Sequence, residues 1–335
     1  MKAYIIKQPA NIETSPLTLV EKGILELLNN QVLLRISKCG LCHTDLHIVE
    51  GELELTKYPV VPGHQIVGKV IKVGKDVSEL KEGDRVGVAW LHKSCDVCKY
   101  CRKGMENLCE NALFTGCNVD GGYAEYTVSD ANFTYKLTQR FDDTQVAPLL
   151  CAGIIGYRSF KLIEPKPSDR IGLYGFGASA HIVIQIAVHI GADIYVFTRS
   201  QKHKELALQL GATWVGNSEE KPPKELDSAI IFAPVGSLYI NALKAIRKGG
   251  IVASAGIYMS DIPQFPYELL YYEKKMISVA NSTRQDAKEL LMLAAKIPIK
   301  TKVTIFSFKE INHALQLLKQ GKINGAAVLD CESII

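Results

Sequence analysis

Two separate groups of cysteine and histidine residues constrain the fold of this chain more than any other feature of its sequence. The first group lies within residues 95–109, here called the four-cysteine lobe, and consists of Cys95, Cys98, Cys101 and Cys109. The second group is dispersed and consists of Cys42, His64 and Cys151. Four thiolates are typical of a closed structural zinc site, whereas three mixed ligands leave one coordination position open. The pattern therefore predicts a metalloenzyme that also carries a metal-stabilised loop.

The spacing within the four-cysteine lobe distinguishes zinc from an iron–sulfur cluster. Bacterial iron–sulfur proteins share Cys-x-x-Cys-x-x-Cys, but they continue with x-x-x-Cys-Pro. Here seven residues separate Cys101 from Cys109, and Glu110 follows instead of proline. The spacing favours zinc, and a closed thiolate shell predicts a structural rather than a catalytic role.

Cysteine usage also bears on the compartment. The chain has nine cysteines, an odd number, and residues 1–9 lack the long apolar core of a signal peptide. Both features favour a reducing, cytoplasmic location over a disulfide framework. Cys39, Cys117 and Cys331 fall outside both groups and are predicted to be buried free thiols.

Charge and hydropathy give no indication of a nucleic-acid or membrane partner. The formal net charge is +4 over 335 residues, and it is not concentrated in a basic block. The most apolar stretch, residues 182–190, is too short to span a bilayer.

The sequence pattern changes near residue 150. Before it, short β-branched runs such as residues 66–74 alternate with glycine and aspartate turns, which predicts a β-rich domain. From residue 171 the order becomes strand, glycine turn, helix and strand, which predicts a parallel, doubly wound sheet. We therefore expect an α/β protein with two domains, residues 1–150 and residues 151–282, with residues 283–335 rejoining the first.

A glycine turn lies at the start of the second pattern. Gly175-Phe176-Gly177 follows a strand and opens an apolar helix, the context in which such a turn binds a dinucleotide. The first glycine permits the turn, the second lets the backbone approach a pyrophosphate, and a small residue at Ala180 allows close helix packing. The helix N-terminus then offers N–H groups to an anion. The residues predicted to bind the dinucleotide are Gly175, Gly177, Ala178 and Ala180; a plain turn is the alternative.

The end of the next strand bears on which dinucleotide binds. NAD enzymes normally place an acidic residue there to bind the ribose 2′-hydroxyl. This chain has Thr198, Arg199 and Ser200 instead. There is no carboxylate in this segment to repel a 2′-phosphate, and the Arg199 guanidinium can bind one. NADP(H) is therefore the favoured cofactor, and NAD(H) is the alternative. For Arg199 itself, the alternative is a solvated surface arginine that binds no ligand.

The motifs and their order along essentially the whole chain resemble those of the zinc-dependent alcohol dehydrogenases of the medium-chain dehydrogenase/reductase family. The resemblance is strongest to microbial and cinnamyl-alcohol-dehydrogenase-like members, and it rests on residues 40–47, Pro62-Gly63-His64, the four-cysteine lobe, Cys151 and the glycine turn. It implies a GroES-like catalytic domain, a central Rossmann domain and an active site in the cleft between them. It also implies one catalytic and one structural zinc ion, a small alcohol or aldehyde as substrate, and a homodimer or homotetramer.

The resemblance assigns a role to each residue of the dispersed group. Cys42, His64 and Cys151 would bind the catalytic zinc. Cys39-x-x-Cys42 could instead be a redox pair, but the family places its ligand directly before the His-Thr-Asp run, which selects Cys42. Asp45 would orient His64, and the alternative is an aspartate that only caps a turn.

Thr44 and His47 would carry the alcohol proton toward solvent, as the family relay does. Threonine is too weak a base to hold a proton, so it would pass one on. By itself His47 would be read as a surface or packing histidine. Trp90 would line the substrate pocket and Ile257 the nicotinamide face, although residues of these types are more often simply part of a core.

Two positions depart from the family pattern. Gln65 follows the histidine ligand where relatives commonly have glutamate, so the metal would be slightly more electrophilic. Ala326 follows Ile323-Asn324-Gly325 where relatives often have an arginine that contacts the pyrophosphate. Its absence would weaken cofactor binding by about 1.5–3 kcal/mol unless another cation substitutes.

The expected function is hydride transfer between NADP(H) and a primary or aromatic alcohol or aldehyde. Gln65 and Ala326 motivate an alternative, an NADPH-binding protein without alcohol turnover. A polyol dehydrogenase and a zinc-free quinone reductase are further alternatives, and the retained ligand set counts against the second of these.

Overall fold

The computed structural model describes residues 1–334 except 24–25, 54 and 56, and it divides into two compact units. Unit 1 contains Met1–Cys151, Asn281–Ala295 and Thr301–Ile335, and unit 2 contains Ala152–Ala280 and Lys296–Lys300. The sequence pattern predicts a first domain of residues 1–150 and 283–335, whereas unit 1 also contains residues 151 and 281–282. Unit 1 does not contain residues 296–300. They belong with unit 2 because Gln185 binds the backbone of Lys300 twice, through its amide nitrogen at 3.0 Å and its oxygen at 2.9 Å.

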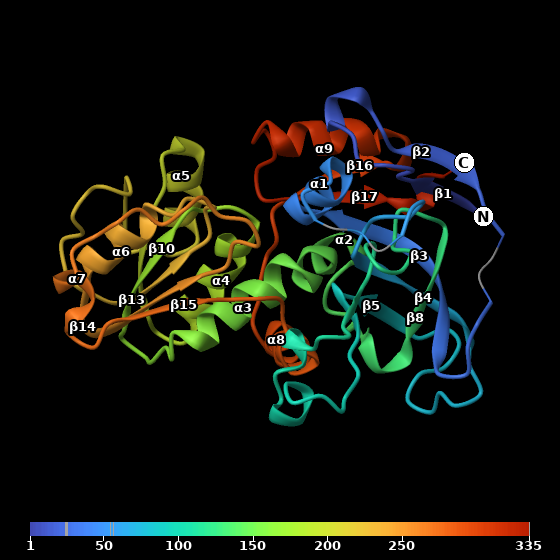
Figure 1. The fold of residues 1–335 in the computed structure, drawn as a ribbon, viewed down its shortest axis with the longest axis horizontal. Coiled ribbons are helices and arrows are strands. Elements are labelled where there is room, and N and C mark those ends of the chain that lie inside the picture. Colours follow the sequence, from blue (N-terminus) through green and yellow to red (C-terminus); the bar gives the residue numbers. More distant parts are fainter. Residues whose placement is uncertain (24–25, 54, 56, 335) are drawn as a thin grey trace. The chain divides into compact units, whose positions relative to one another are not determined.

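Unit 1 is built on a mostly antiparallel sheet (Figure 1). Among the described residues, seven strands form it in the order β16-β17-β3-β4-β5-β9, with β8 paired to β3. The strands are β3 (Gln31–Leu41), β4 (Gln65–Val73), β5 (Arg85–Val88), β8 (Tyr126–Asp130), β9 (Thr134–Lys136), β16 (Val303–Ser307) and β17 (Ala326–Asp330). Two hairpin-like pairs accompany it, β1 (Lys2–Ile5) with β2 (Thr18–Glu21) and β6 (Leu91–Lys93) with β7 (Leu113–Phe114).

The helices of unit 1 connect these strands. The α-helices are α1 (His43–Glu50), α2 (Asp143–Val146), α8 (Arg284–Lys296) and α9 (Ile311–Lys319). The 3-10 helices are η1 (Ile12–Thr14), η2 (Cys101–Lys103), η3 (Glu106–Leu108), η4 (Ala131–Phe133), η5 (Ala147–Leu150), η6 (Phe308–Glu310) and η7 (Cys331–Ser333).

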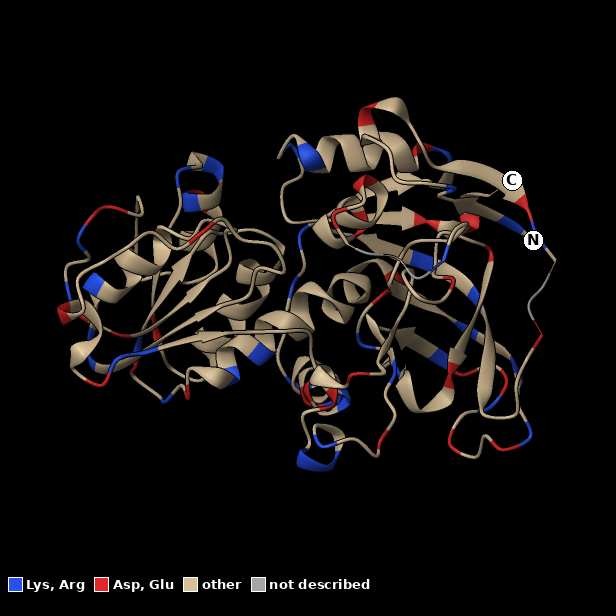
Figure 2. Cartoon of the chain, viewed as in Figure 1, with Lys and Arg blue, Asp and Glu red and all other residues tan. Residues whose placement is uncertain are grey.

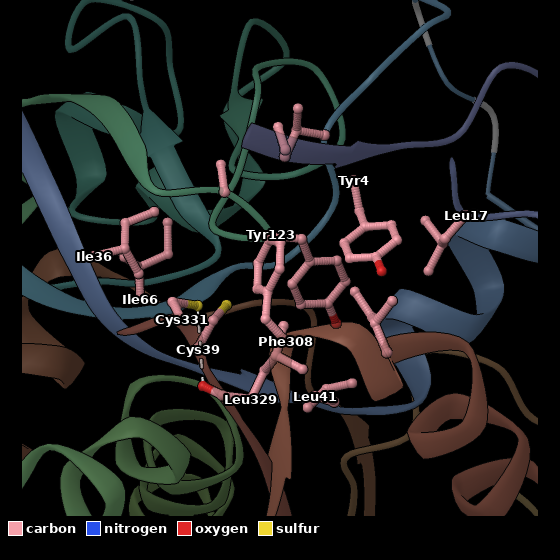
Figure 3. Close-up of a cluster of buried hydrophobic side chains, with 14 of the residues drawn as sticks. Tyr4, Leu17, Ile36, Cys39, Leu41, Ile66, Tyr123, Phe308, Leu329 and Cys331 are labelled. Atoms are coloured by element: carbon pink, nitrogen blue, oxygen red, sulfur yellow. Dashed lines mark hydrogen bonds between the residues drawn. The ribbon is translucent and has the colours of Figure 1, made fainter. Parts of the chain in front are cut away.

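The hydrophobic core of unit 1 contains residues from near both ends of the chain. Tyr4 from β1 packs against Phe308 from η6, with ring centroids 5.1 Å apart (Figure 3). Cys39 and Cys331 lie in the same buried cluster, and Cys117 is buried elsewhere in the unit. The prediction that these three cysteines are buried free thiols is confirmed.

Unit 2 contains a parallel sheet (Figure 1). Among the described residues, six strands form it in the order β12-β11-β10-β13-β14-β15, and α3, α4 and α6 pack against them. The strands are β10 (Arg170–Tyr174), β11 (Asp193–Phe197), β12 (Trp214–Gly216), β13 (Leu226–Ile231), β14 (Ile246–Ser254) and β15 (Lys275–Ser278). The helices are α3 (Ala152–Leu162), α4 (Ala178–His189), α5 (Gln201–Gln209), α6 (Leu238–Ala245) and α7 (Glu268–Tyr271). The predicted fold class, a β-rich domain and a doubly wound parallel-sheet domain, is confirmed.

Charged residues are distributed over both units, with Lys and Arg interspersed with Asp and Glu (Figure 2). None of the helices in the described part of the chain is long and apolar enough to cross a membrane.

His92, on β6, is a buried histidine for which the sequence offers no role. Only 5% of its surface is exposed, and its Nδ1 has no hydrogen-bond partner among the described residues. Burial, with a smaller contribution from Lys93, lowers the pKa of His92 to about 4. The folded protein therefore keeps this ring neutral at pH values where an unfolded chain would protonate it.

We expect this histidine to make the folded state sensitive to mild acid. Between about pH 6.5 and pH 4 the unfolded state binds the proton first, so the free energy of unfolding falls as the pH falls. The loss is about 2 kcal/mol between pH 7 and pH 5. Urea unfolding of wild type and His92→Phe at both pH values measures it, because the variant lacks this contribution. Equal pH dependence in the two proteins would contradict the prediction.

Candidate active site and metal centres

Strand pairing brings the dispersed ligand group together. Gly40 on β3 pairs with Gln65 on β4, so Cys42, just after β3, lies beside His64, just before β4. Cys151 directly follows η5, which packs against both strands. Cys42 Sγ lies 3.5 Å from His64 Nε2 and 3.9 Å from Cys151 Sγ. Residues distant in sequence thus place three ligand atoms within 4.8 Å of one another.

These separations match what a tetrahedral zinc ion requires. Bonds of about 2.3 Å to sulfur and about 2.0 Å to nitrogen put two sulfur atoms roughly 3.8 Å apart, and a sulfur and a nitrogen roughly 3.5 Å apart. The observed distances are 3.9 and 3.5 Å. Two sulfurs and one imidazole leave a fourth position, so the donor set fits an open zinc site.

Asp45 supports the imidazole from behind. Its Oδ1 lies 3.3 Å from His64 Nδ1, and both side chains are completely buried. Its Oδ2 accepts a hydrogen bond of 2.8 Å from the backbone N–H of Cys42. Asp45 is therefore both a helix cap and a partner of the histidine, so the two readings of this residue are not exclusive. It directs Nε2 of His64 toward the sulfurs.

The electrostatics of this group favour a positive charge. The hydrogen bond with Cys151 holds the pKa of Cys42 well below its usual range, and the same contact together with burial raises the pKa of Cys151. Burial alone would lower the pKa of His64, but Asp45 and Cys42 outweigh it and raise that pKa to about 10. A thiolate and a buried carboxylate thus stabilise positive charge here, whether it is a proton or a metal ion.

Helix α1 carries the two predicted relay residues. It starts directly after Cys42, and Thr44 and His47 are three residues apart, so they lie on the same helix face. The Thr44 hydroxyl is close enough to Cys42 to contribute, after Cys151 and His64, to lowering its pKa. Both Thr44 and His47 are half-buried, whereas Asp45 between them is buried.

Trp90 lies next to the same group. Its ring meets that of His64 edge-on, with centroids 5.1 Å apart, and it stacks on Phe114 at 5.0 Å. The half-buried indole is therefore in position to form an apolar wall near the three ligands. Ile257, in contrast, is 49% exposed in unit 2.

The four-cysteine lobe forms a second ligand group. Sulfur–sulfur distances are 3.5 Å between Cys98 and Cys101, 3.5 Å between Cys95 and Cys109, and 4.0 Å between Cys95 and Cys101. Three backbone N–H groups point at the sulfurs of Cys95, Cys98 and Cys109 from 3.4–3.5 Å. Hydrogen bonds of this kind, led by that from Cys101, lower the pKa of Cys98 to about 6. The group has the composition and spacing of a closed structural zinc site.

In unit 2 the glycine turn borders a cavity. Gly175 has a φ of +90°, and a side chain there would meet Ala233 at 2.9 Å. A Cβ built on Gly177 meets nothing within 4 Å, so the space above the N-terminus of α4 is open. Ala178 begins α4, and Ala180 is buried within it. A pyrophosphate fits this open space, since the helix N-terminus faces it.

The cavity, of about 680 Å³, extends from Gly175 to the end of β11. The predicted residues Thr198, Arg199 and Ser200 line it, and the Ser200 hydroxyl caps α5. Several other residues line the cavity that the sequence pattern does not predict, among them His203, Ser218, Glu219, Ser237 and Asn241. Ser218 and Glu219 follow β12, whose end aligns with that of β11 through the pair Phe197–Gly216. Identifying them requires both recognising β12 as a strand and placing it beside β11, because parallel strands end at one edge.

The two departures from the family pattern lie in unit 1. Gln65 is 2% exposed, and its Nε2 has no hydrogen-bond partner among the described residues. Ala326 starts β17 and is buried, so it offers no charge to a ligand.

Comparisons with known proteins agree with this geometry. Residues 29–139 match the family described as alcohol dehydrogenase GroES-like domain, and residues 180–296 match that described as zinc-binding dehydrogenase. A probable alcohol dehydrogenase, AdhA of Mycobacterium tuberculosis, is 45% identical over 335 residues, covering 98% of this chain and 97% of the relative.

Two solved structures extend the likeness to the whole chain. CAD from Helicobacter pylori, complexed with NADP(H), is 27% identical with a TM-score of 0.89, covering 100% of this chain and 99% of the other. Acetophenone reductase from Geotrichum candidum, in complex with NAD, is also 27% identical with a TM-score of 0.89, covering 99% and 98%.

Proposed function

Because this chain belongs to the zinc-type medium-chain alcohol dehydrogenases, we propose that it interconverts a primary or aromatic alcohol and its aldehyde with NADP(H). The observation that carries the proposal is the convergence of Cys42, His64 and Cys151 beside a helix that bears Thr44 and His47. An acetophenone reductase among the structural neighbours and the Trp90 ring beside His64 support an aromatic substrate.

In this proposal the two ligand groups hold two zinc ions with different roles. The ion held by Cys42, His64 and Cys151 supplies Lewis acidity, which stabilises the negative charge that develops on a substrate oxygen. Asp45 fixes the His64 ring through Nδ1, and Trp90 keeps one side of the group apolar. The four-cysteine lobe binds a structural ion and takes no part in the chemistry.

Thr44 and His47 move the proton that alcohol oxidation releases. A hydroxyl can accept one hydrogen bond while donating another, so Thr44 passes the proton without holding it. His47 lies one helical turn further on and accepts the proton for release to solvent. The Thr44 hydroxyl contributes to lowering the pKa of Cys42, which supports the placement of Thr44 close to the dispersed ligand group.

The dinucleotide is proposed to bind in unit 2, which corresponds to the domain expected from residues 151–282. Gly175 and Gly177 give the pyrophosphate access to the N-terminus of α4, and Ala178 and Ala180 keep that helix start small. Thr198, Arg199 and Ser200 border the adenosine ribose, where Arg199 binds a 2′-phosphate.

Replacing Arg199 with aspartate is expected to shift cofactor preference toward NAD. The change removes a charge-assisted contact of about 1.5–3 kcal/mol and adds repulsion, so the ratio of kcat/KM for NADP to that for NAD falls on the order of 100-fold. The matched control is Lys202→Asp, which changes charge equally on an exposed residue of α5. Equal shifts in both variants, or none in Arg199→Asp, would contradict a specific phosphate contact.

A homo-oligomer in a reducing, cytoplasmic compartment completes the proposal. Strand β15 is at the edge of its sheet, and edge strands offer backbone groups to a partner. Tyr267, Tyr271 and Tyr272, which precede β15, are 47–71% exposed and contact one another. None of the nine cysteines, all of which the structure describes, forms a disulfide, which supports the compartment.

The decisive experiment is a matrix of two cofactors against several alcohols. NAD and NADP are each tested with small aliphatic, benzylic and cinnamyl alcohols, and total zinc per chain is measured in the same preparation. We expect two zinc ions per chain and the highest kcat/KM for NADP with an aromatic alcohol. Tight NADPH binding without turnover of any alcohol or aldehyde would refute the proposed activity.

A further inference from the structure

We propose that Glu52 is the proton acceptor at the outer end of the relay, taking the proton from His47 and delivering it to water. This inference rests on the proposed function, because it extends the path that Thr44 and His47 begin. Glu52 lies outside every motif that the sequence analysis identified.

The C-terminal cap of α1 brings Glu52 back to His47. The helix ends at Glu50, and Gly51 turns the chain with a φ of +79°. The backbone N–H groups of Gly51 and Glu52 both donate to the carbonyl oxygen of His47, the second at 2.9 Å. Gly51 also has no room for a side chain, since a Cβ there would lie 2.6 Å from Pro9. The backbone therefore fixes the position of residue 52 relative to residue 47.

The two side chains are in direct contact. His47 Nδ1 and Glu52 Oε2 form a short hydrogen bond. A carboxylate is an acceptor, so the nitrogen facing it carries the hydrogen and Nε2 bears the lone pair. The Glu52 carboxylate thus selects the tautomer in which His47 can take up a proton at Nε2.

The proton balance follows from this tautomer. A proton that arrives at Nε2 forms a bond there, and the Nδ1–H bond breaks as its proton passes to Oε2 of Glu52. The imidazole ends neutral, and the carboxylic acid then loses its proton to water or to a buffer base. The ring returns to its first tautomer by exchange of one proton, so each turnover exports the one proton that alcohol oxidation produces.

Side-chain exposure increases along this path. The His47 side chain is 16% exposed and that of Glu52 is 43% exposed. The imidazole therefore has limited contact with solvent, whereas the carboxylate reaches it. A partly shielded ring beside an exposed carboxylate is suited to outward proton transfer.

Glu50 lies near the same imidazole but is already engaged. Its Oε1 accepts from the backbone N–H of Ile12 at 3.0 Å and from Lys319 Nζ of α9 at 2.7 Å. Burial alone would raise the pKa of Glu50, but the contacts with Ile12 and Lys319, together with His47, outweigh it and lower that pKa. Glu50 and Lys319 are the other charged groups around the end of α1 that these contacts identify. Glu50 thus supplies negative charge near His47, and it offers a control that separates charge from proton transfer.

The experiment compares Glu52→Gln, Glu52→Asp and Glu50→Gln in the full-length, zinc-loaded enzyme. Stopped-flow measurement with a pH indicator follows proton release during oxidation of the best alcohol from the matrix, near pH 7 in dilute buffer. We expect Glu52→Gln to slow proton release about threefold to tenfold, since solvent still reaches part of His47. Raising the imidazole concentration is expected to restore the rate, Glu52→Asp to retain most of it, and Glu50→Gln to match wild type.

Three outcomes would overturn the inference. They are an unchanged rate in Glu52→Gln, a slowed rate that imidazole does not restore, and an equal slowing in Glu50→Gln, which would indicate an effect of charge alone. Failure of the proposed function is distinguished separately, because wild type would then oxidise no alcohol.

Discussion

Replacing Cys151 with alanine is expected to lower kcat for alcohol oxidation by about 1,000-fold or more while the protein stays folded. The Cys151 sulfur lies 3.9 Å from that of Cys42, and its loss leaves only two of the three proposed ligands. Stabilisation of charge by a metal ion is worth several kcal/mol, and each ~1.4 kcal/mol corresponds to a factor of ten in rate. Steady-state kinetics and zinc analysis of the purified variant measure the two effects together.

The matched control is Cys117→Ala, which removes a buried thiol that belongs to neither ligand group. We expect this control to retain two zinc ions per chain and wild-type kcat, whereas Cys151→Ala retains one. Wild-type kcat in a Cys151→Ala preparation that contains a single zinc ion would refute the role assigned to the dispersed group.

The four cysteines of the lobe can be grouped from the sequence alone, because short-range patterns carry most of the information. Cys95, Cys98 and Cys101 lie close together in any fold, and their spacing limits the metals that fit. Cys42 and His64 are harder, because they meet only when β3 pairs with β4 in the observed register. No local rule gives that register, so the resemblance to a family was needed to join them to Cys151.

Residues that depend on strand order or on helix ends could not be predicted in this way. Ser218 and Glu219 line the unit 2 cavity because β12 lies beside β11, and the order of strands is not written in a local pattern. Glu52 contacts His47 because a glycine ends α1 and reverses the chain. Glycine after a helix is a recognised stop signal, yet it does not reveal which side chain the returning chain brings close.

Asp45 illustrates a different limit of sequence reasoning. From the sequence alone, a role in a turn and a role as partner of the metal-binding histidine are two separate hypotheses for this aspartate. In the structure the two oxygens of one carboxylate serve both roles, one toward Cys42 N–H and one toward His64. The cap therefore fixes the carboxylate that in turn fixes the imidazole.

The four-cysteine lobe has little apolar packing of its own but holds the start of α8. Within the lobe, η2 and η3 are each three residues long, and Val97 is 64% exposed. Glu106 accepts from the backbone N–H of Arg284 at 2.5 Å and from its Nε at 2.7 Å, and Asp96 binds the same guanidinium at 2.7 Å. The guanidinium also lies 4.5 Å from the centre of the Phe133 ring. A metal that fixes the lobe therefore also fixes the residues that dock this arginine.

Replacing Cys101 with serine is expected to reduce zinc from two ions per chain to one and to lower the free energy of unfolding by several kcal/mol. Metal binding contributes directly to folding where a loop lacks a core, and about 1–3 kcal/mol more is lost as the ion pairs of Arg284 loosen. Thermal unfolding and hydrogen exchange across residues 95–109 and 281–295 test this, with faster exchange expected in both segments.

The control is Glu106→Gln, which weakens the ion pair but keeps all four sulfurs. It should retain two zinc ions and exchange faster only at residues 281–295. Because the dispersed ligand group is intact in Cys101→Ser, its folded fraction should keep alcohol dehydrogenase activity at temperatures well below the transition. Loss of kcat in that fraction, with the remaining zinc ion present, would show that the lobe takes part in catalysis and is not purely structural.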